Sequence, residues 1–423
     1  MLRKIMAFAL VFVMVLTSSV TLLAYAPENE EILDISHESF QDYFNFETYS
    51  DDLLTEESVF NRLSLFVGGS SMSRMDSGDD YVLKSDFGGM HVDIDDPGVL
   101  VLLFREDSES LENAVNSLDG QMIDFSRDGV FRVEVRASEH SEEDLESIRG
   151  LLIDNMLELG IRTLGVLVDL GRVQVGLIEE TRMEEFVVKN NIIKFLVENS
   201  RFNEDELHSK IEFLSLTEDD IPQLFTRTDE RDIIMDAHVD IDALSGNIGA
   251  GSMVNNGRGY ATVGLRSINA LGFITTGHEF RQGDVIFQGR FTQGLRVGRV
   301  ERVTFNGRDD SAFVRLEPGV PFAGPNNDII SSARVVHNQV LSAQGGISGT
   351  MTMRVLRPSH SYTGHGFTWH DIIVTDRAMR HGDSGGALFT LNGSQRTIRG
   401  LVHGMIESRN ETWFIPSFNL NTR

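Results

Sequence analysis

Gly382-Asp383-Ser384-Gly385-Gly386 stands directly before the apolar run Ala387-Leu388-Phe389. A serine between glycines, followed by a buried strand, is typical of a nucleophile on a tight turn. Glycine adopts backbone angles that other residues avoid, and its missing Cβ lets a carbonyl group approach closely. The N–H groups of Gly382 and Ser384 can then bind a developing oxyanion. A glycine-rich hairpin with an incidental serine has the same pattern, so this interpretation needs a base and an orienting acid elsewhere.

Two further positions supply these partners. His278 ends one predicted strand, and Asp310 begins the stretch Asp310-Ser311-Ala312-Phe313-Val314. A histidine can take the proton of Ser384 and return it to a leaving amine. A buried aspartate fixes the tautomer of that histidine and stabilises the imidazolium. Asp309 is the alternative acid, but the alternation of the strand favours Asp310.

Length and composition indicate a globular protein of more than one domain. The chain has 423 residues, of which 41% are hydrophobic and 24% are charged. This length suggests two or three domains, and the composition is not that of a disordered chain. The sequence contains no cysteine. Disulfides, thiolate metal sites and a cysteine nucleophile are therefore excluded.

The net charge of −27 is divided unevenly along the chain. Residues 236–423 hold 18 arginines and 15 acidic residues, whereas residues 1–235 hold 19 basic and 49 acidic residues. Of the 39 glycines, 26 follow residue 240. Such a break indicates two regions with different roles. The acidic region would repel phosphates, so we expect no nucleic-acid partner, but it could pair with the arginine-bearing region.

Residues 1–26 have the pattern of a secretory signal peptide. A basic start precedes an apolar run over 5–15, and Ala24-Tyr25-Ala26 resembles a cleavage site. An uncleaved membrane anchor is the alternative, although polar residues interrupt the apolar run. No later stretch is long and apolar enough to span a bilayer. We therefore expect secretion, with no stable membrane insertion after signal cleavage.

Residues 27–214 predict an acidic α/β module. Hairpin-then-helix patterns occur twice, and a helix that begins near Ser141 lies between them. The module contains no group of residues that carries chemistry, so its acids are most simply a solvated surface, with a docking face as the alternative. Residues 215–242 are dense in acids and predict a linker where proteolytic processing concentrates. The predicted strands cover 90–94, 99–104, 131–135, 164–169 and 173–177, and the predicted helices cover 108–118, 141–156 and 182–197.

Residues 243–423 predict an all-β domain, because short apolar runs recur there between glycine, asparagine and aspartate. Its motifs resemble those of chymotrypsin-fold serine proteases of the streptogrisin and α-lytic type. Thr275-Thr276-Gly277-His278 is similar to the family string T-A-G-H, with Thr276 in place of alanine. Asp310 to Val314 is similar to D-x-A-x-V, and Gly382 to Gly386 is similar to the whole serine motif.

The resemblance implies a double β-barrel, trypsin-like protease domain over 243–423, preceded by a pro-region over 27–214. It implies a secreted bacterial serine endopeptidase that is made as a zymogen. Ser384 would attack the peptide carbonyl, with His278 as base and Asp310 as its orienting acid. The implied partners are protein or peptide substrates and the chain's own pro-region, which would act as an intramolecular inhibitor and folding catalyst. No cofactor or metal is expected. The alternative is a catalytically silent trypsin-fold binding module with a permanent acidic partner domain.

Four residues near these motifs differ from the family or bear on specificity. Glu279 stands where the family usually has cysteine after the histidine. His403 stands where a serine usually contacts the catalytic aspartate, which puts the local geometry in question. Arg380 and His381 flank the nucleophile turn, and with His403 they could favour an acidic residue before the cleaved bond. The alternative is a surface histidine and a rim arginine.

Overall fold

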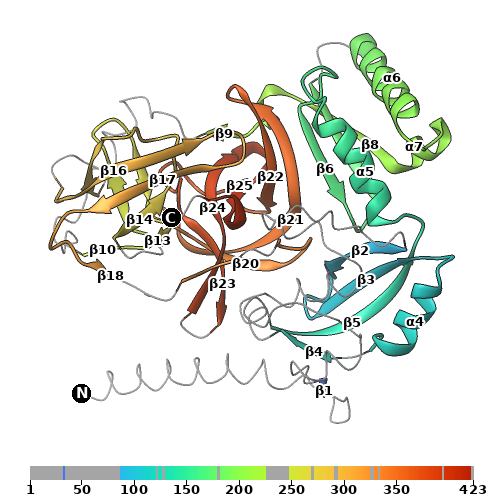
Figure 1. Cartoon of the computed structure of the whole chain (residues 1–423), viewed down its shortest axis with the longest axis horizontal. Coiled ribbons are helices and arrows are strands. Elements are labelled where there is room, and N and C mark those ends of the chain that lie inside the picture. The colour runs from blue at the N-terminus through green and yellow to red at the C-terminus, as the bar shows by residue number, and fades with distance from the viewer. Residues whose placement is uncertain are drawn as a thin grey trace, which may run out of the picture.

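The computed structural model describes most of the chain after residue 85 (Figure 1). The predicted signal peptide, residues 225–242 of the predicted linker and the first four residues of the predicted protease domain, 243–246, lie outside the described residues. Within the described ranges, no helix has the length and apolar content to cross a membrane. These ranges are 32–33, 86–120, 122–125, 129–178, 182–224, 247–267, 271–289, 294–323, 328–331, 334–392 and 395–420.

The first sheet lies in the acidic region and is mixed (Figure 1). Its strand order is β1-β4-β5-β3-β2, with β3 parallel to β5 and antiparallel to β2. Ser108 caps the helix α4, because its side chain accepts a hydrogen bond from the N–H of Leu111. The elements are β1 (Ile32–Leu33), β2 (Phe87–Val92), β3 (Val99–Arg105), α4 (Glu109–Ser117), β4 (Met122–Phe125) and β5 (Gly129–Ser138).

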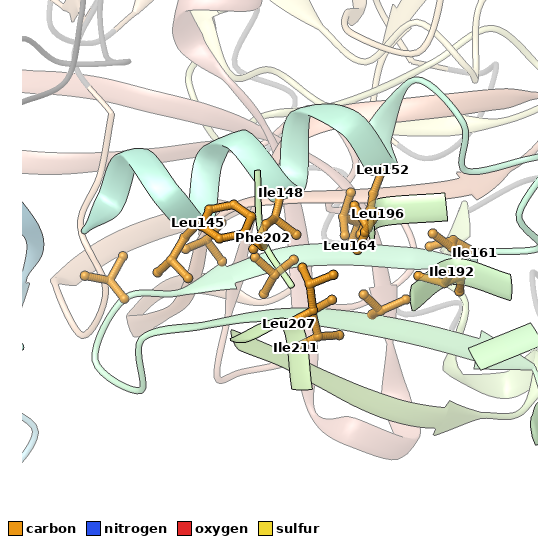
Figure 2. Close-up of a cluster of buried hydrophobic side chains, with 14 of the residues drawn as sticks. Leu145, Ile148, Leu152, Ile161, Leu164, Ile192, Leu196, Phe202, Leu207 and Ile211 are labelled. Carbon is orange, nitrogen blue, oxygen red and sulfur yellow. The ribbon is translucent and has the colours of Figure 1, made fainter. Parts of the chain in front are cut away.

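A second unit of the acidic region packs three helices against the strands β6, β7 and β8. The predicted face of α5 is buried, since Leu145, Ile148 and Leu152 contribute to the core in Figure 2. The predicted hairpin is present as β6 and β7, with Gly171 at a positive φ of 61° in its turn. The elements are α5 (Glu142–Ile153), β6 (Thr163–Leu167), β7 (Arg172–Ile178), α6 (Arg182–Asn199), α7 (Glu204–Lys210) and β8 (Ile211–Leu216).

The structure describes the first ten residues, 215–224, of the segment expected to link the two regions. The segment begins inside β8, whose last residue Leu216 is buried, and continues through a 3-10 helix (Glu218–Asp220) to β9 (Gln223–Leu224). β9 pairs antiparallel with β24 of the arginine-bearing region. Asp220 of this segment also forms an ion pair with Arg409 at 2.6 Å, so both main-chain pairing and an acidic side chain fix it against the arginine-bearing region.

The arginine-bearing region is mostly β-sheet, as predicted. Its first large sheet has the order β12-β11-β15-β16-β17-β14-β13, and its apolar side chains form one core that includes Phe273 and Val314. β10 and β18 pair separately. The strands are β10 (Ile248–Gly249), β11 (Met253–Asn255), β12 (Tyr260–Thr262), β13 (Leu265–Arg266), β14 (Gly272–Thr275), β15 (Val285–Gln288), β16 (Arg296–Phe305), β17 (Asp310–Leu316) and β18 (Phe322–Ala323).

The second large sheet closes on itself. Its strands follow the order β20-β23-β24-β25-β22-β21, and β21 pairs back with β20. Trp369 and Trp413 are buried in its core. Of the two barrels expected, this one is closed by the pairings of the described residues, while the first sheet is an open path. The strands are β19 (Ile329–Ile330), β20 (Val340–Gly345), β21 (Gly349–Gly364), β22 (Phe367–Thr375), β23 (Ala387–Asn392), β24 (Gln395–Ile406) and β25 (Glu411–Pro416).

The two regions share one sheet, because β6 of the acidic region pairs with β21 of the closed barrel (Figure 1). Gly165 lies opposite His360, and Thr163 lies opposite Tyr362. The sheet therefore continues without a break from the barrel into β6, β7 and β8. A Cβ on Gly165 would overlap Nδ1 of the buried His360, so this register requires glycine.

Candidate active site

The three residues of the predicted catalytic group come from both large sheets and meet between them. His278 follows β14, and Asp310 begins β17, the strand paired with β14. Ser384 lies in the turn that leads into β23 of the closed barrel. The site is thus assembled at the contact between the two sheets.

Side-chain contacts connect the three residues in series. His278 Nε2 lies 3.2 Å from Ser384 Oγ, and His278 Nδ1 lies 2.6 Å from Asp310 Oδ2. The aspartate that contacts His278 is therefore Asp310 and not Asp309. Asp310 accepts a hydrogen bond from the Nδ1–H of His278. The lone pair on His278 Nε2 therefore faces the hydroxyl of Ser384. This tautomer is the one that a general base acting on Ser384 requires.

Asp310 is completely buried and densely hydrogen-bonded. Its Oδ1 accepts the N–H groups of Gly277 and His278, each at 2.8 Å. Its Oδ2 accepts from Thr276 Oγ1 at 3.1 Å and from Nδ1 of both His278 and His403 at 2.6 Å. Burial alone would raise the pKa of Asp310, but the charge of His278 and the hydrogen bonds from both histidines hold it well below its usual range. The carboxylate is therefore a permanent negative charge.

The same contacts shape the basicity of His278. Burial acts to lower the pKa of His278, but the charge and hydrogen bond of Asp310, and then the charge of Glu279, raise it above its ordinary value. A raised pKa makes the imidazole a stronger base toward the serine hydroxyl. Two carboxyl groups contribute to this, and the second had no assigned role in the sequence motifs.

The turn that carries Ser384 is held by glycines and by Asp383. Gly382 and Gly385 have positive φ values of 96° and 81°, which favour glycine. The carboxylate of Asp383 accepts the N–H groups of Ile347 and Arg380, at 2.7 and 2.8 Å. Asp383 is thus a residue of the site whose structural role the sequence did not indicate.

The predicted oxyanion donors, Gly382 and Ser384, lie on this turn. Among the described residues, no acceptor takes the N–H of either one. Both residues are buried, so a substrate oxygen placed there would meet two donors out of bulk water. Such donors stabilise charge that develops on a carbonyl oxygen.

His403 lies inside the site, next to Asp310. Its ring is fully buried, with Nδ1 at 2.6 Å from Asp310 Oδ2 and Nε2 at 2.7 Å from the hydroxyl of Tyr362. Burial lowers the pKa of His403 more than Asp310 raises it, so the ring is neutral, donates from Nδ1 and accepts from Tyr362. Burial also raises the pKa of Tyr362, which keeps that hydroxyl protonated. Tyr362 carried no sequence signal, because it lies 41 residues before His403 on another strand.

The other two residues considered for specificity, Arg380 and His381, are exposed beside the nucleophile turn. They differ in this from His403, whose side chain faces the interior. The two imidazole rings of His278 and His403 and the carboxylate of Asp310 also place possible metal-ligand atoms within 4.8 Å of one another, the one such group among the described residues. Both Nδ1 atoms already donate to Asp310, so the hydrogen bonds account for this geometry.

A segment of the chain itself lies along the strand that carries His403. Leu224 and Gln223 of β9 pair antiparallel with Gly404 and Met405 of β24. The same strand contacts the nucleophile turn, since the N–H of Gly385 donates to the Val402 carbonyl at 2.8 Å. β9 therefore covers the edge of β24 immediately beyond the site.

No family model and no curated protein matches the chain. The chain is similar to the solved structure of a chymotrypsin from Cellulomonas bogoriensis, at 23% identity, covering 40% of this chain and 91% of that one with a TM-score of 0.33. It is also similar to protease A of Thermobifida fusca, at 22% identity over 40% and 91% of the two chains with a TM-score of 0.32. An α-lytic protease homolog, N4, is 22% identical over 40% and 93%, with a TM-score of 0.33. Since these TM-scores are low, we base the proposed function on the residues of the site.

Proposed function

We propose that this chain is a serine endopeptidase that hydrolyses peptide bonds. The observation that carries the proposal is the series Ser384–His278–Asp310, with contacts of 3.2 Å and 2.6 Å, on a turn that presents two free N–H groups. A serine, a base and a buried orienting acid in this order supply every group that an acyl-enzyme reaction requires. No cofactor takes part in this chemistry.

The reaction follows from the geometry. Ser384 Oγ attacks the peptide carbonyl while His278 Nε2 takes its proton, and Asp310 stabilises the resulting imidazolium. The N–H groups of Gly382 and Ser384 hold the oxyanion of the tetrahedral intermediate. His278 then gives its proton to the leaving amine, and water, activated by His278, hydrolyses the acyl-enzyme. The neutral His403, supported by Tyr362, keeps Asp310 in place throughout.

We further propose that residues 27–214 are a pro-region that inhibits the enzyme and assists its folding. The pairing of β9 with β24 supports inhibition by the linker segment that follows the pro-region, because an extended substrate would need the same main-chain groups of Gly404 and Met405. The pairing of β6 with β21 supports a folding role, since it adds a preformed strand to the barrel. Protein or peptide substrates would replace β9 once the linker is cut.

Secretion from a bacterium belongs to the same proposal. It is supported by the signal-peptide pattern of residues 1–26 and by the resemblance of the motifs to secreted bacterial proteases. The absence of cysteine permits but does not require this location. Mass analysis of culture supernatant from cells that express the chain tests it, and retention of residues 1–26 would contradict it.

The Ser384→Ala variant tests the catalytic proposal. We expect peptide hydrolysis to fall by at least about a thousandfold and the acidic region to stay attached, because the variant lacks the nucleophile. Ser209→Ala, which removes an exposed hydroxyl on α7, is the matched control and should behave as wild type. Hydrolysis of a peptide library and the N-terminus of the secreted product are the readouts. Full activity in Ser384→Ala would contradict the mechanism.

A further inference from the structure

Glu279 is a second carboxyl group beside the reacting nitrogen. Its Oε1 lies 3.9 Å from His278 Nε2, the atom that faces Ser384 Oγ at 3.2 Å. Its side chain is 7% exposed, so the carboxyl is screened little by water. Asp310 contacts the other ring nitrogen of His278. The imidazole therefore lies between two carboxyl groups.

A turn holds Glu279 in this position. Asn256 Nδ2 donates to the Glu279 carbonyl at 3.2 Å. The side-chain oxygen of Asn256 accepts the N–H of Gly259 at 3.0 Å, which closes the turn over the glutamate. A Cβ on Gly259 would overlap Glu279 Oε2, so glycine allows this close approach. The placement of the carboxyl is thus built into the fold.

The charges around Glu279 leave it without a permanent cation. Among the described residues, His278 is the one basic group within ion-pair distance of its carboxyl. Arg258, on the same turn, is bound instead by both oxygens of Asp284, at 2.6 and 2.8 Å. Asp310 of β17 adds negative charge behind His278. A buried carboxylate in this setting gains a partner only when His278 becomes an imidazolium.

We propose that Glu279 is a positioning residue that acts through His278: its carboxylate stabilises the imidazolium that forms when Ser384 gives up its proton. This inference rests on the proposed function. The proton moves from Ser384 Oγ to His278 Nε2, and Glu279 takes no proton and forms no bond. The charge of the ion pair develops only in the transition state, so the interaction favours reaction over substrate binding. The effect on kcat should therefore exceed the effect on KM.

The pH dependence gives this role a distinctive signature. Burial, with the charge of Asp310 adding to it and that of His278 opposing it, raises the pKa of Glu279 to about 7. Below that pH the carboxyl of Glu279 is neutral and does not stabilise the imidazolium of His278. Above it the full charge is present. The advantage of wild type over Glu279→Gln should thus be near unity at acid pH and grow as pH rises through neutrality.

The test compares three variants made in the full chain. Glu279→Gln removes the charge with little change in shape, and Glu279→Asp keeps the charge one methylene farther away. Glu301→Gln, an exposed carboxylate of β16, is the control for a lost charge in the same sheet. The secreted enzymes are purified, and kcat and KM for one peptide are measured from acid to alkaline pH. Titration of active sites with a fluorophosphonate corrects for any misfolded fraction.

We expect Glu279→Gln to lose about tenfold in kcat at alkaline pH, little at acid pH, and little in KM at any pH, where tenfold corresponds to about one pKa unit. Glu279→Asp should lose less, with the same pH dependence, and it decides the question if the glutamine variant is not secreted. A constant ratio across pH in the variant that is secreted would overturn the inference. Failure of the proposed function looks different, because wild type and Glu301→Gln would then hydrolyse no more peptide than Ser384→Ala.

Discussion

The two regions, described within 86–224 and 247–420, are both stabilised by buried apolar side chains. They differ in where the residues of the candidate active site lie. Each has hydrophobic cores of its own, yet His278, Asp310, Ser384, His403 and Tyr362 all belong to the second region. The first region contacts the second through the strand pairing of β6 and β9 and through ion pairs between side chains. The residues of the candidate active site therefore all come from one region, and the other region contributes strands and ion pairs to the contact between them.

The ion pairs between the two regions do not all have the signs that the net charges of the regions suggest. Arg149 of the acidic region is buried and lies 3.3 Å from Asp371 of the arginine-bearing region, the reverse of the expected signs. Asp220, by contrast, pairs with Arg409 at 2.6 Å as the overall charges suggest. Pairing across this contact therefore depends on particular residues and not on the net charges of the two regions.

The largest effect on this contact is expected from Gly165→Ala. The added Cβ would overlap His360 Nδ1, and His360 packs against Trp413 with 5.2 Å between ring centroids. We expect a loss of about 3 kcal/mol in the free energy of unfolding of the joined sheet. Gly150→Ala, where a Cβ meets open space on the helix α5, is the control and should be neutral or slightly stabilising. Denaturant unfolding of both in the Ser384→Ala background, which keeps the chain intact, decides the matter; equal stabilities would show that β6 does not join the barrel.

A smaller effect is expected from Arg149→Met. The change removes a buried partner of Asp371, but Arg334 remains 3.3 Å from the same carboxylate. We expect a loss of about 2 kcal/mol, measured in the same way. Arg105→Met breaks an exposed pair with Asp107 within the acidic region and should cost less than about 0.5 kcal/mol. If both variants lose the same amount, the buried pair is not what holds the regions together.

The smallest effect is expected from Tyr362→Phe, which lies where the two regions meet. Tyr362 pairs with Thr163 of β6 through its backbone and contacts His403 through its hydroxyl. The variant leaves His403 Nε2 without its donor, a loss of about 1 kcal/mol. We expect kcat to fall about fivefold, with KM unchanged. An unchanged kcat would show that the hydrogen bond from Tyr362 to His403 has a structural role and no catalytic one.

The residues of the site that can be predicted from sequence are those whose chemistry demands a particular type on a particular turn. His278, Asp310 and Ser384 meet this condition, and the structure brings the three together. Strand and helix patterns likewise predicted α5 and the β6–β7 hairpin, since their apolar spacing follows from burial.

The remainder depends on contacts that leave no local pattern. Tyr362 meets His403 only because two distant strands lie in one barrel. β9 could not be predicted from its acidic stretch of sequence. It pairs with the main chain of β24, and the types of its side chains give no sign of that pairing. Glu279 was noticed as a departure from the family, but its distance to His278 Nε2 depends on the turn at Asn256 and Gly259.

Covalent labelling of the secreted protein with a fluorophosphonate tests the central claim most directly. Only a serine activated by a neighbouring base reacts, so intact mass and peptide mapping should place one adduct on Ser384. His278→Ala should abolish the adduct, whereas His365→Ala, an exposed histidine between β21 and β22, should leave it unchanged. Absence of the adduct from wild type that has lost its acidic region, or an adduct that persists in His278→Ala, would contradict the account and favour a catalytically silent binding module.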